Sequence, residues 1–329
     1  MPEADALTGK RQRFGFIDLA KGLMLIKIII THTQGYFITY PIDNFSLVVF
    51  FICAGFTSRP DFSLRRIFGK LLVPYVIMNL ICVAYVAIVA PANISLQSLA
   101  GILYSRNSVL PLSAGADRIP MLSLCNSVLW FTTALMSAYC VFRLITIPSG
   151  RKAQALACLL SLALAALCTR LPVLLPWSVD TAFFLAPFMW AGRQMRAEGV
   201  LDRMSWKGFA LLSAIYAATY FPAGHTNYSV REYGDSFLIG AVCALSGAVA
   251  FIWLCVRLDR LRPLRAVKLM NSQAMYVFGL QLVFIDATGS LSRHFGLPEV
   301  VEVLTGIALA CVGGYFAGRV INAGIRLCK

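Results

Sequence analysis

Four ionisable residues lie in one long apolar run near the start of the chain: Asp18, Lys21, Lys27 and His32. Inside a membrane-spanning run, an ionisable side chain is costly and usually faces a cavity or a partner. The imidazole of His32 is a candidate general base, because histidine titrates near neutral pH and its neutral form accepts a proton from a hydroxyl. This run is therefore the first place to look for a reaction site.

Helical spacing places three of these residues on one stripe. At about 100° per residue, Lys21 and His32 lie about 20° apart around the axis, and Asp18 lies about 40° from His32. His32 also lies about 16 Å beyond Lys21 along the axis. A cation at one mouth and a deeper imidazole fit a substrate with an anionic head, a long thin arm and a reactive end. Acyl-coenzyme A has that shape.

Purely structural roles also fit the same spacing. Lys21 can extend to the membrane interface, and His32 can be a hydrogen-bonded packing residue. Lys27 lies about 140° from His32 and so faces away from the stripe. We expect Lys27 to pair with a carboxylate from another span, with a gating or proton-coupled role as the alternative.

The elements that position these residues must be membrane helices. The chain has 329 residues, of which 59% are apolar and 13% charged, and its mean hydropathy is +0.74. Soluble domains average roughly 45 to 50% apolar and about 25% charged residues, so a water-soluble globule is excluded. Ten spans of about 20 residues fit this length and leave only short connections. We expect one transmembrane domain over residues 1–329, with no separate soluble domain.

Ten apolar runs predict an all-α, polytopic membrane helix bundle. They lie at about residues 15 to 38, 45 to 57, 71 to 90, 122 to 147, 153 to 175, 178 to 192, 208 to 222, 236 to 256, 270 to 288 and 300 to 321. The longest connection, roughly 91 to 121, contains three prolines and is expected to be irregular and to fold over the outer mouth.

The distribution of basic residues gives the orientation. Of the 29 Lys and Arg residues, 22 lie in segments on one side of this parse, five lie on the other, and Lys21 and Lys27 lie within the first run. Lys and Arg collect on the cytoplasmic side, so both termini are expected to be cytoplasmic. The net charge of +14 then reflects membrane orientation, and no nucleic-acid partner is expected.

Cysteine chemistry is not expected to contribute a site. The ten cysteines include no CxxC pair and lie mostly inside apolar runs, where cysteine behaves as a small hydrophobic residue. Neither a disulfide framework nor a metal site is predicted.

The residues from Arg13 to Gly22, followed by an apolar helix ending in Thr31-His32, resemble the opening of acyltransferase family 3. This family comprises membrane-bound O-acyltransferases of bacterial surface glycans, and the likeness is greatest to its fucose 4-O-acetylase-like branch. The resemblance implies that His32 is the catalytic histidine and that Lys21 is the basic residue eleven positions before it.

Further stretches match the family in order. They are Phe50 to Phe56, Arg65-Arg66 to Lys70, Leu72 to Tyr75, Leu129 to Leu135, and Trp177 through Gly192-Arg193. The chain departs from the family pattern at several positions. Ser46 and Gln281 stand where relatives often have His. Cys53-Ala54 replaces the usual residues before Gly55, and Lys27 replaces an apolar residue.

The resemblance implies a multi-pass enzyme of the cell inner membrane. It would transfer an acyl group, with acetyl expected, from cytoplasmic acyl-coenzyme A to a hydroxyl of a surface or exported glycan or of its lipid-linked precursor. Acetyl-coenzyme A, or another short acyl-coenzyme A, would be the co-substrate, and no metal is expected. The lipid bilayer is its other partner; nothing in the sequence specifies an oligomeric state.

Two sets of side chains are expected to bind the substrates. Arg65 and Arg66 would bind donor phosphates, because guanidinium recognises phosphate through two hydrogen bonds; the alternative is that they only add to the inner positive charge. Lys21 and Asp18 complete the donor set. The acceptor set is Trp130, Asp180, Ser46 and Gln281, although Trp130 also fits a packing role and Asp180 a helix cap.

A transporter or flippase for an anionic or sugar substrate is the rival interpretation, since ten spans with an intramembrane Lys and His fit it too. His225 and His294 are expected in solvated outer loops.

The orientation can be tested directly. We expect a reporter fused after Lys329 to be active only in the cytoplasm, and one inserted near Gly115 only outside, because of the asymmetry of basic residues. A C-terminus on the outside would mean that one span is miscounted.

Overall fold

The computed structural model describes residues 14–33, 39–111, 123–261 and 264–327, without the side chains of 123–127. Within these ranges the chain is helical apart from short turns and one pair of two-residue antiparallel strands, β1 (Thr226–Asn227) and β2 (Glu232–Tyr233). The expected all-α membrane bundle is confirmed.

Each of the ten apolar runs overlaps one long helix of the described ranges. These helices are α1 (Gly15–Thr31), α3 (Asp43–Phe56), α4 (Leu64–Val89), α6 (Ser123–Ile145), α7 (Arg151–Cys168), α8 (Val179–Ala197), α10 (Trp206–Ala223), α11 (Phe237–Leu258), α13 (Ala274–Phe295) and α14 (Glu299–Leu327). Shorter helices are α5 (Leu96–Tyr104), α9 (Val200–Arg203) and α12 (Arg265–Asn271), with single 3-10 turns η2 (Tyr40–Ile42), η3 (Pro91–Asn93), η5 (Pro176–Ser178) and η6 (Tyr228–Val230).

Six of the described helices, α4, α6, α7, α11, α13 and α14, are long and apolar enough to cross a membrane. α1 and α3, with 17 and 14 residues, are shorter than a typical span of about 20 residues. The chain is thus a multi-pass membrane protein, and the count of ten spans remains a prediction. Below, "inner" denotes the side predicted to face the cytoplasm and "outer" the opposite side.

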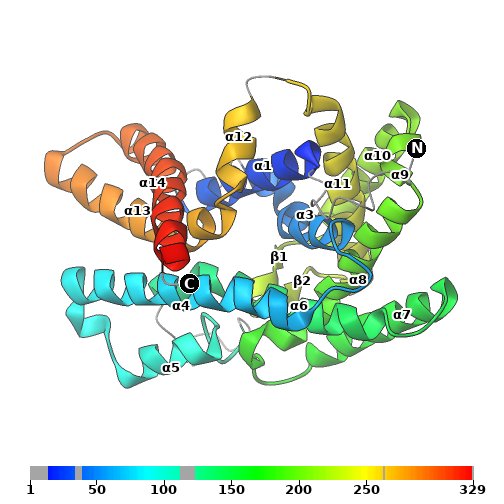
Figure 1. The fold of residues 1–329 in the computed structure, drawn as a ribbon, viewed down its shortest axis with the longest axis horizontal. Helices are drawn as coiled ribbons and strands as arrows, with labels where there is room; N and C mark the ends of the chain where they lie inside the picture. Colours follow the sequence, from blue (N-terminus) through cyan, green and yellow to red (C-terminus); the bar gives the residue numbers. More distant parts are fainter. Residues whose placement is uncertain (1–13, 34–38, 112–122, 262–263, 328–329) are drawn as a thin grey trace.

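Helix α1 lies in the interior of the bundle. It contacts α3, α11, α12, α13 and α14, and its residues Leu19, Ala20, Leu25 and Ile29 are fully buried. Figure 1 shows the α13–α14 pair on one side of α1, α10 and α11 on the other, and α4, α5 and α7 in the lower half of the view. A helix surrounded in this way can expose polar side chains only to internal cavities.

Glycines let neighbouring helices approach closely. Gly55 of α3 and Gly192 of α8 meet the other helix's backbone so tightly that a Cβ on either would overlap it. Gly313 and Gly314 of α14 likewise pack against Phe284 and Val277 of α13, the close approach that small residues allow between membrane helices.

The outer connection contains more structure than expected. Residues 96–104 form α5, where an irregular segment was predicted, so that expectation was wrong. The helix begins with a capping box in which the hydroxyls of Ser95 and Ser98 each accept from the other's backbone N–H, a signal that the proline-based interpretation overlooked. Residues 112–122 of this connection lie outside the described residues.

A buried ionic network holds the outer loops to the bundle. Asp180, at the start of α8, pairs with Arg106 and Arg231, and its carboxylate also accepts from the backbone N–H groups of Leu175 and Thr181. Asp180 and Arg106 are fully buried. The guanidinium groups also donate to the backbone carbonyls of residues 171, 173, 175 and 229 and to the hydroxyl of Thr181, so most of their N–H groups have an acceptor.

Tyr233 of β2 adds to this network by donating to the carbonyl oxygen of Asp180 over 3.4 Å. Burial, reinforced by the nearby Asp180 charge, raises the pKa of Tyr233, which keeps the phenol protonated as a donor. The structure therefore gives Asp180 a role in the fold, whereas the sequence suggested a sugar-binding or simple capping role.

This network predicts a large effect on stability. We expect Asp180→Asn to lower the free energy of unfolding by about 3 to 5 kcal/mol, because two buried guanidinium groups lose their counter-charge. Thermal unfolding of the detergent-purified protein measures the change. The matched control is Glu198→Gln, which breaks the exposed Arg151–Glu198 pair and should cost less than about 1 kcal/mol. Equal melting temperatures for the two variants would contradict this account.

Candidate active site

The side chain of His32 folds back along its own helix at the outer end of α1. Its ring Nδ1 lies 2.8 Å from the carbonyl oxygen of Ile28. Because a carbonyl oxygen only accepts hydrogen bonds, Nδ1 carries the hydrogen in the neutral ring and Nε2 keeps its lone pair. The local fold thus selects the tautomer that can act as a base through Nε2.

An outer cavity of about 520 Å³ surrounds this end of α1. Its wall includes His32, Lys27 and Thr31 of α1, Asp43 and Ser46 of α3, Trp130 of α6, Phe278 of α13, Asn107, and residues 225–229 around β1. The structure therefore brings three predicted site residues, His32, Ser46 and Trp130, to one cavity. A second cavity of about 260 Å³ also touches His32 and is lined by Ile285, Glu302 and Gly306.

Lys27 faces the outer cavity, contrary to the expectation that it points away from the site. The helical spacing was right, but the cavity wraps around an arc of about 140° of α1, wide enough to include both Lys27 and His32. The ammonium of Lys27 pairs with the carboxylate of Asp43 and lies 3.5 Å from Ser46 Oγ. Asp43, at the start of α3, is the partner expected from another span.

An inner cavity of about 380 Å³ lies on the other side of the bundle. It is lined by Lys21 of α1, Lys70 and Pro74 of α4, Phe131 and Thr132 of α6, and residues 271–276 and 278. Asp18 supports this wall indirectly, because its carboxylate accepts from Asn271 Nδ2 at 2.8 Å. Lys21, Lys70 and Pro74 lie in the inner halves of their helices, whereas Phe131 and Thr132 lie in the outer half of α6, close to its middle.

A basic cavity of about 390 Å³ adjoins the inner cavity. Arg59, Arg66 and Lys70 line it together with Asp61 and Tyr139, and Lys70 lines the inner cavity too. Arg65 is exposed on the same turn of α4 and is not among the residues that line this cavity. The two predicted arginines are thus separated, with Arg66 in the cavity and Arg65 at the surface.

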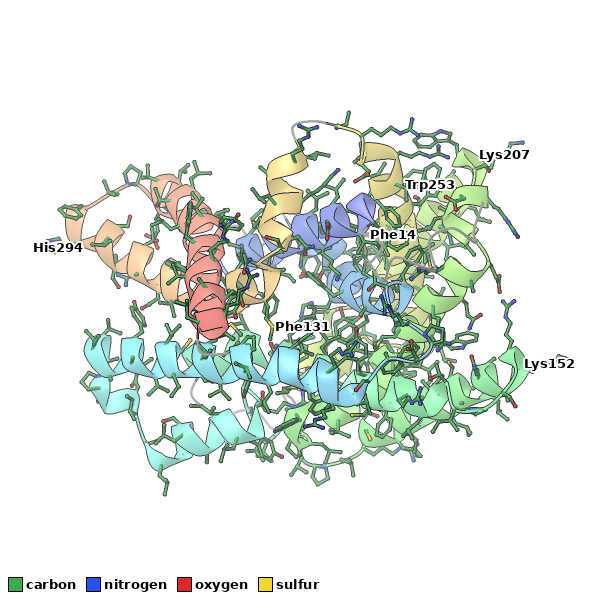
Figure 2. The ribbon with its side chains drawn as sticks, viewed as in Figure 1. Phe14, Phe131, Lys152, Lys207, Trp253 and His294 are labelled. Atoms are coloured by element: carbon green, nitrogen blue, oxygen red, sulfur yellow. The ribbon has the colours of Figure 1, made fainter. Side chains whose placement is uncertain are left out.

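Three phenylalanine rings cluster at the point where the inner and outer cavities share a lining residue, Phe278. The ring centroid of Phe278 lies 4.9 Å from that of Phe131, which lies 5.4 Å from that of Phe50. We call these three residues the phenylalanine partition. Figure 2 places Phe131 in the middle of the molecule, while Lys152, Lys207 and His294 mark its edges. We therefore expect a molecule that reaches from one cavity to the other to pass these rings.

Gln281 of α13 is fully buried, and neither atom of its side-chain amide has a hydrogen-bond partner among the described residues. It lies one turn from Phe278, which lines the outer cavity, and one turn from Ile285, which lines the smaller one. An unsatisfied buried amide costs about 1 to 3 kcal/mol, and Gln281 itself is not among the residues that line the described cavities.

Some residues of the outer cavity were not identified from the sequence. His225 is exposed, as expected of a loop residue, yet it also lines the cavity and stacks on Tyr40 with ring centroids 6.0 Å apart. Asn107 and Asn227 line the same cavity from two connections. Helical periodicity carries no information about such residues, because long-range contacts such as that between Arg106 and Ser229 position them.

A comparison with known families gives one match. The model of the acyltransferase domain of acyltransferase family 3 matches residues 14–319, a range that contains Lys21, His32 and the phenylalanine partition. No curated protein and no solved structure matches the chain.

The partition makes a prediction about access. In a background without reactive native cysteines, we expect Ser229→Cys to react with a membrane-impermeant maleimide only from outside and Ser272→Cys only from the cytoplasmic side. Both serines line their cavities and are partly or fully exposed. Adding Phe278→Ala should make Ser272→Cys reactive from outside as well. Labelling of Ser272→Cys from outside with Phe278 intact would contradict the partition.

Proposed function

The chain belongs to acyltransferase family 3, and we propose that this membrane acyltransferase is an O-acetyltransferase of the cell inner membrane. It takes the acyl group from cytoplasmic acyl-coenzyme A, with acetyl as the expected group. The acceptor is a hydroxyl of a surface or exported glycan or of its lipid-linked precursor. The observation that carries this proposal is the placement of a histidine base and a basic cavity on opposite sides of one aromatic partition.

The basic and inner cavities suit the donor. Arg66, Arg59 and Lys70 supply cations for the phosphates of coenzyme A at the inner mouth. Lys21 lies deeper, where it would meet the part of the donor that carries the arm. Asp18 acts through Asn271 on the cavity wall, and Arg65 would contact a phosphate from the exposed rim.

The arm then extends along the inner cavity toward the partition. Its reactive end must travel about 16 Å from the level of Lys21 to that of His32. Movement of the Phe278 and Phe131 rings would open this path and bring the thioester into the outer cavity, beside Nε2 of His32.

The outer cavity suits a sugar. It offers the indole of Trp130, the hydroxyl of Ser46 and the amides of Asn107 and Asn227, an apolar ring with several hydrogen-bonding groups around it. Gln281 lies one turn from Phe278 on α13, and movement of the Phe278 ring would let its buried amide reach the substrates.

The chemistry follows from the tautomer of His32. Nε2 takes the proton of the acceptor hydroxyl as its oxygen attacks the thioester carbon. The tetrahedral intermediate collapses, the C–S bond breaks, and the coenzyme A thiolate takes the proton back from His32. The ester and free coenzyme A leave, and the base is regenerated.

A transporter or flippase is the alternative to this enzyme. The family match favours the acyltransferase, and transfer of label from acetyl-coenzyme A to a glycan or lipid-linked sugar separates the two functions, because a transporter performs no such reaction.

Kinetics of two variants separate donor binding from chemistry. Lys21→Ala should raise the half-saturating acetyl-coenzyme A concentration roughly 10- to 150-fold, the equivalent of about 1.5 to 3 kcal/mol for a hydrogen bond to a charged group. His32→Ala should instead lower the turnover number about 10²- to 10⁴-fold with donor binding retained. Initial rates of label transfer in inverted membrane vesicles measure both parameters.

Lys21→Arg should keep part of the donor affinity. His294→Ala is the control for the histidine variant, because His294 is exposed at the end of α13, away from the described cavities. If Lys21→Ala binds the donor normally and loses only turnover, the proposed path of the donor is incorrect.

A further inference from the structure

The reaction as described leaves one buried ion pair unused. Lys27 and Asp43 are 5% and 13% exposed, and both line the outer cavity beside His32. Removing two charges from water carries a penalty that their mutual attraction often does no more than offset, so an apolar pair would serve the fold as well. The pair therefore needs a reason beyond stability.

The hydrogen bonds of Lys27 leave one donor available. An ammonium has three N–H groups; Asp43 accepts from one, and Ser46 Oγ lies 3.5 Å away as the acceptor for a second. Ser46 is a suitable acceptor because its own hydroxyl donates to the backbone carbonyl of Asp43 at 3.1 Å. Within the described part of the chain, no acceptor is found for the third N–H, and Lys27 lines the cavity.

The same cavity holds the base. Nδ1 of His32 is tied to the carbonyl of Ile28, the residue that follows Lys27, so the imidazole folds back along α1 toward the level of Lys27. The Cα atoms of the two residues are separated by only about 7.5 Å along the axis, a distance that the two side chains can bridge. The two side chains leave the helix about 140° apart and both line the same cavity, so a reacting group that fills the cavity between them can contact both Nε2 and the ammonium.

We propose that Lys27 is a catalytic residue, whose third N–H donates to the oxygen of the tetrahedral intermediate. This inference rests on the proposed acyl transfer. As the acceptor oxygen bonds to the thioester carbon, the C=O electron pair moves to the carbonyl oxygen, which becomes an oxyanion held by Lys27. The pair returns when the C–S bond breaks, and His32 passes the acceptor's proton to the departing thiolate.

Asp43 and Ser46 are positioning residues in this scheme. They hold the ammonium in one place before the charge develops, and Asp43 balances its charge while the cavity is empty. A donor oriented in advance in a site shielded from water gains most when the negative charge appears in the transition state. Loss of one such donor typically lowers turnover about 10²- to 10³-fold.

The test uses a double variant, because Lys27→Met alone would leave Asp43 buried without its partner. Lys27→Met combined with Asp43→Leu removes both charges and keeps an apolar contact. We expect this variant to fold, to bind acetyl-coenzyme A with wild-type affinity, and to lose about 10²- to 10³-fold in turnover at saturating donor. Lys27→Arg, which retains a cationic donor, should recover part of the turnover.

Labelled acetyl-coenzyme A and inverted vesicles containing the endogenous acceptor provide the assay. Lys207→Met is the matched control, since Lys207 is exposed near the inner end of α10 and lies at the edge of the molecule in Figure 2. Wild-type turnover in the folded double variant would overturn the role proposed for Lys27 and leave the proposed acyl transfer in place. Absence of transfer in both the wild type and Lys207→Met would overturn the proposed function, and this inference with it.

Discussion

A charged side chain that leaves water for the interior of a membrane bundle must be paired or must line a cavity, and this constraint organises the molecule. Asp180 pairs with Arg106 and Arg231, and this network joins the outer loops to the start of α8. Asp43 pairs with Lys27 at the wall of the outer cavity. The Asp180 network holds the outer loops next to the outer cavity, and the Lys27–Asp43 pair lies in the wall of that cavity.

In the proposed reaction the two ends of α1 serve different substrates, because the helix passes between two cavities. Lys21 meets the inner cavity and His32 the outer one, with Phe278 common to both. A donor with a long arm and an acceptor on the opposite side of the membrane can then meet at one imidazole. In that reaction the partition of Phe50, Phe131 and Phe278, whose rings lie about 5 Å apart, would keep the cavities apart when no arm passes between them.

Local patterns predicted the helices and the placement of Lys21 and His32 at different depths of one helix, because helical period and hydropathy depend on neighbouring residues. They did not predict the residues that complete the outer cavity. The contacts that place Asn107, residues 225–229 and Asp180 join positions up to 184 residues apart in the chain, and sequence spacing says nothing about such contacts. Lys27 was misplaced for a related reason: its angle on the helix was correct, but the width of the cavity depends on α3, α6 and α13.

The central claim is that the donor enters from the cytoplasmic side and reacts on the outer side of the partition. The most direct measurement adds labelled acetyl-coenzyme A outside sealed membrane vesicles of the host cell and follows label in the glycan and lipid-linked fractions. Inverted vesicles, which present the cytoplasmic side, should incorporate label into an acceptor shielded inside them, and right-side-out vesicles should not. Incorporation by right-side-out vesicles at an equal rate would contradict the account.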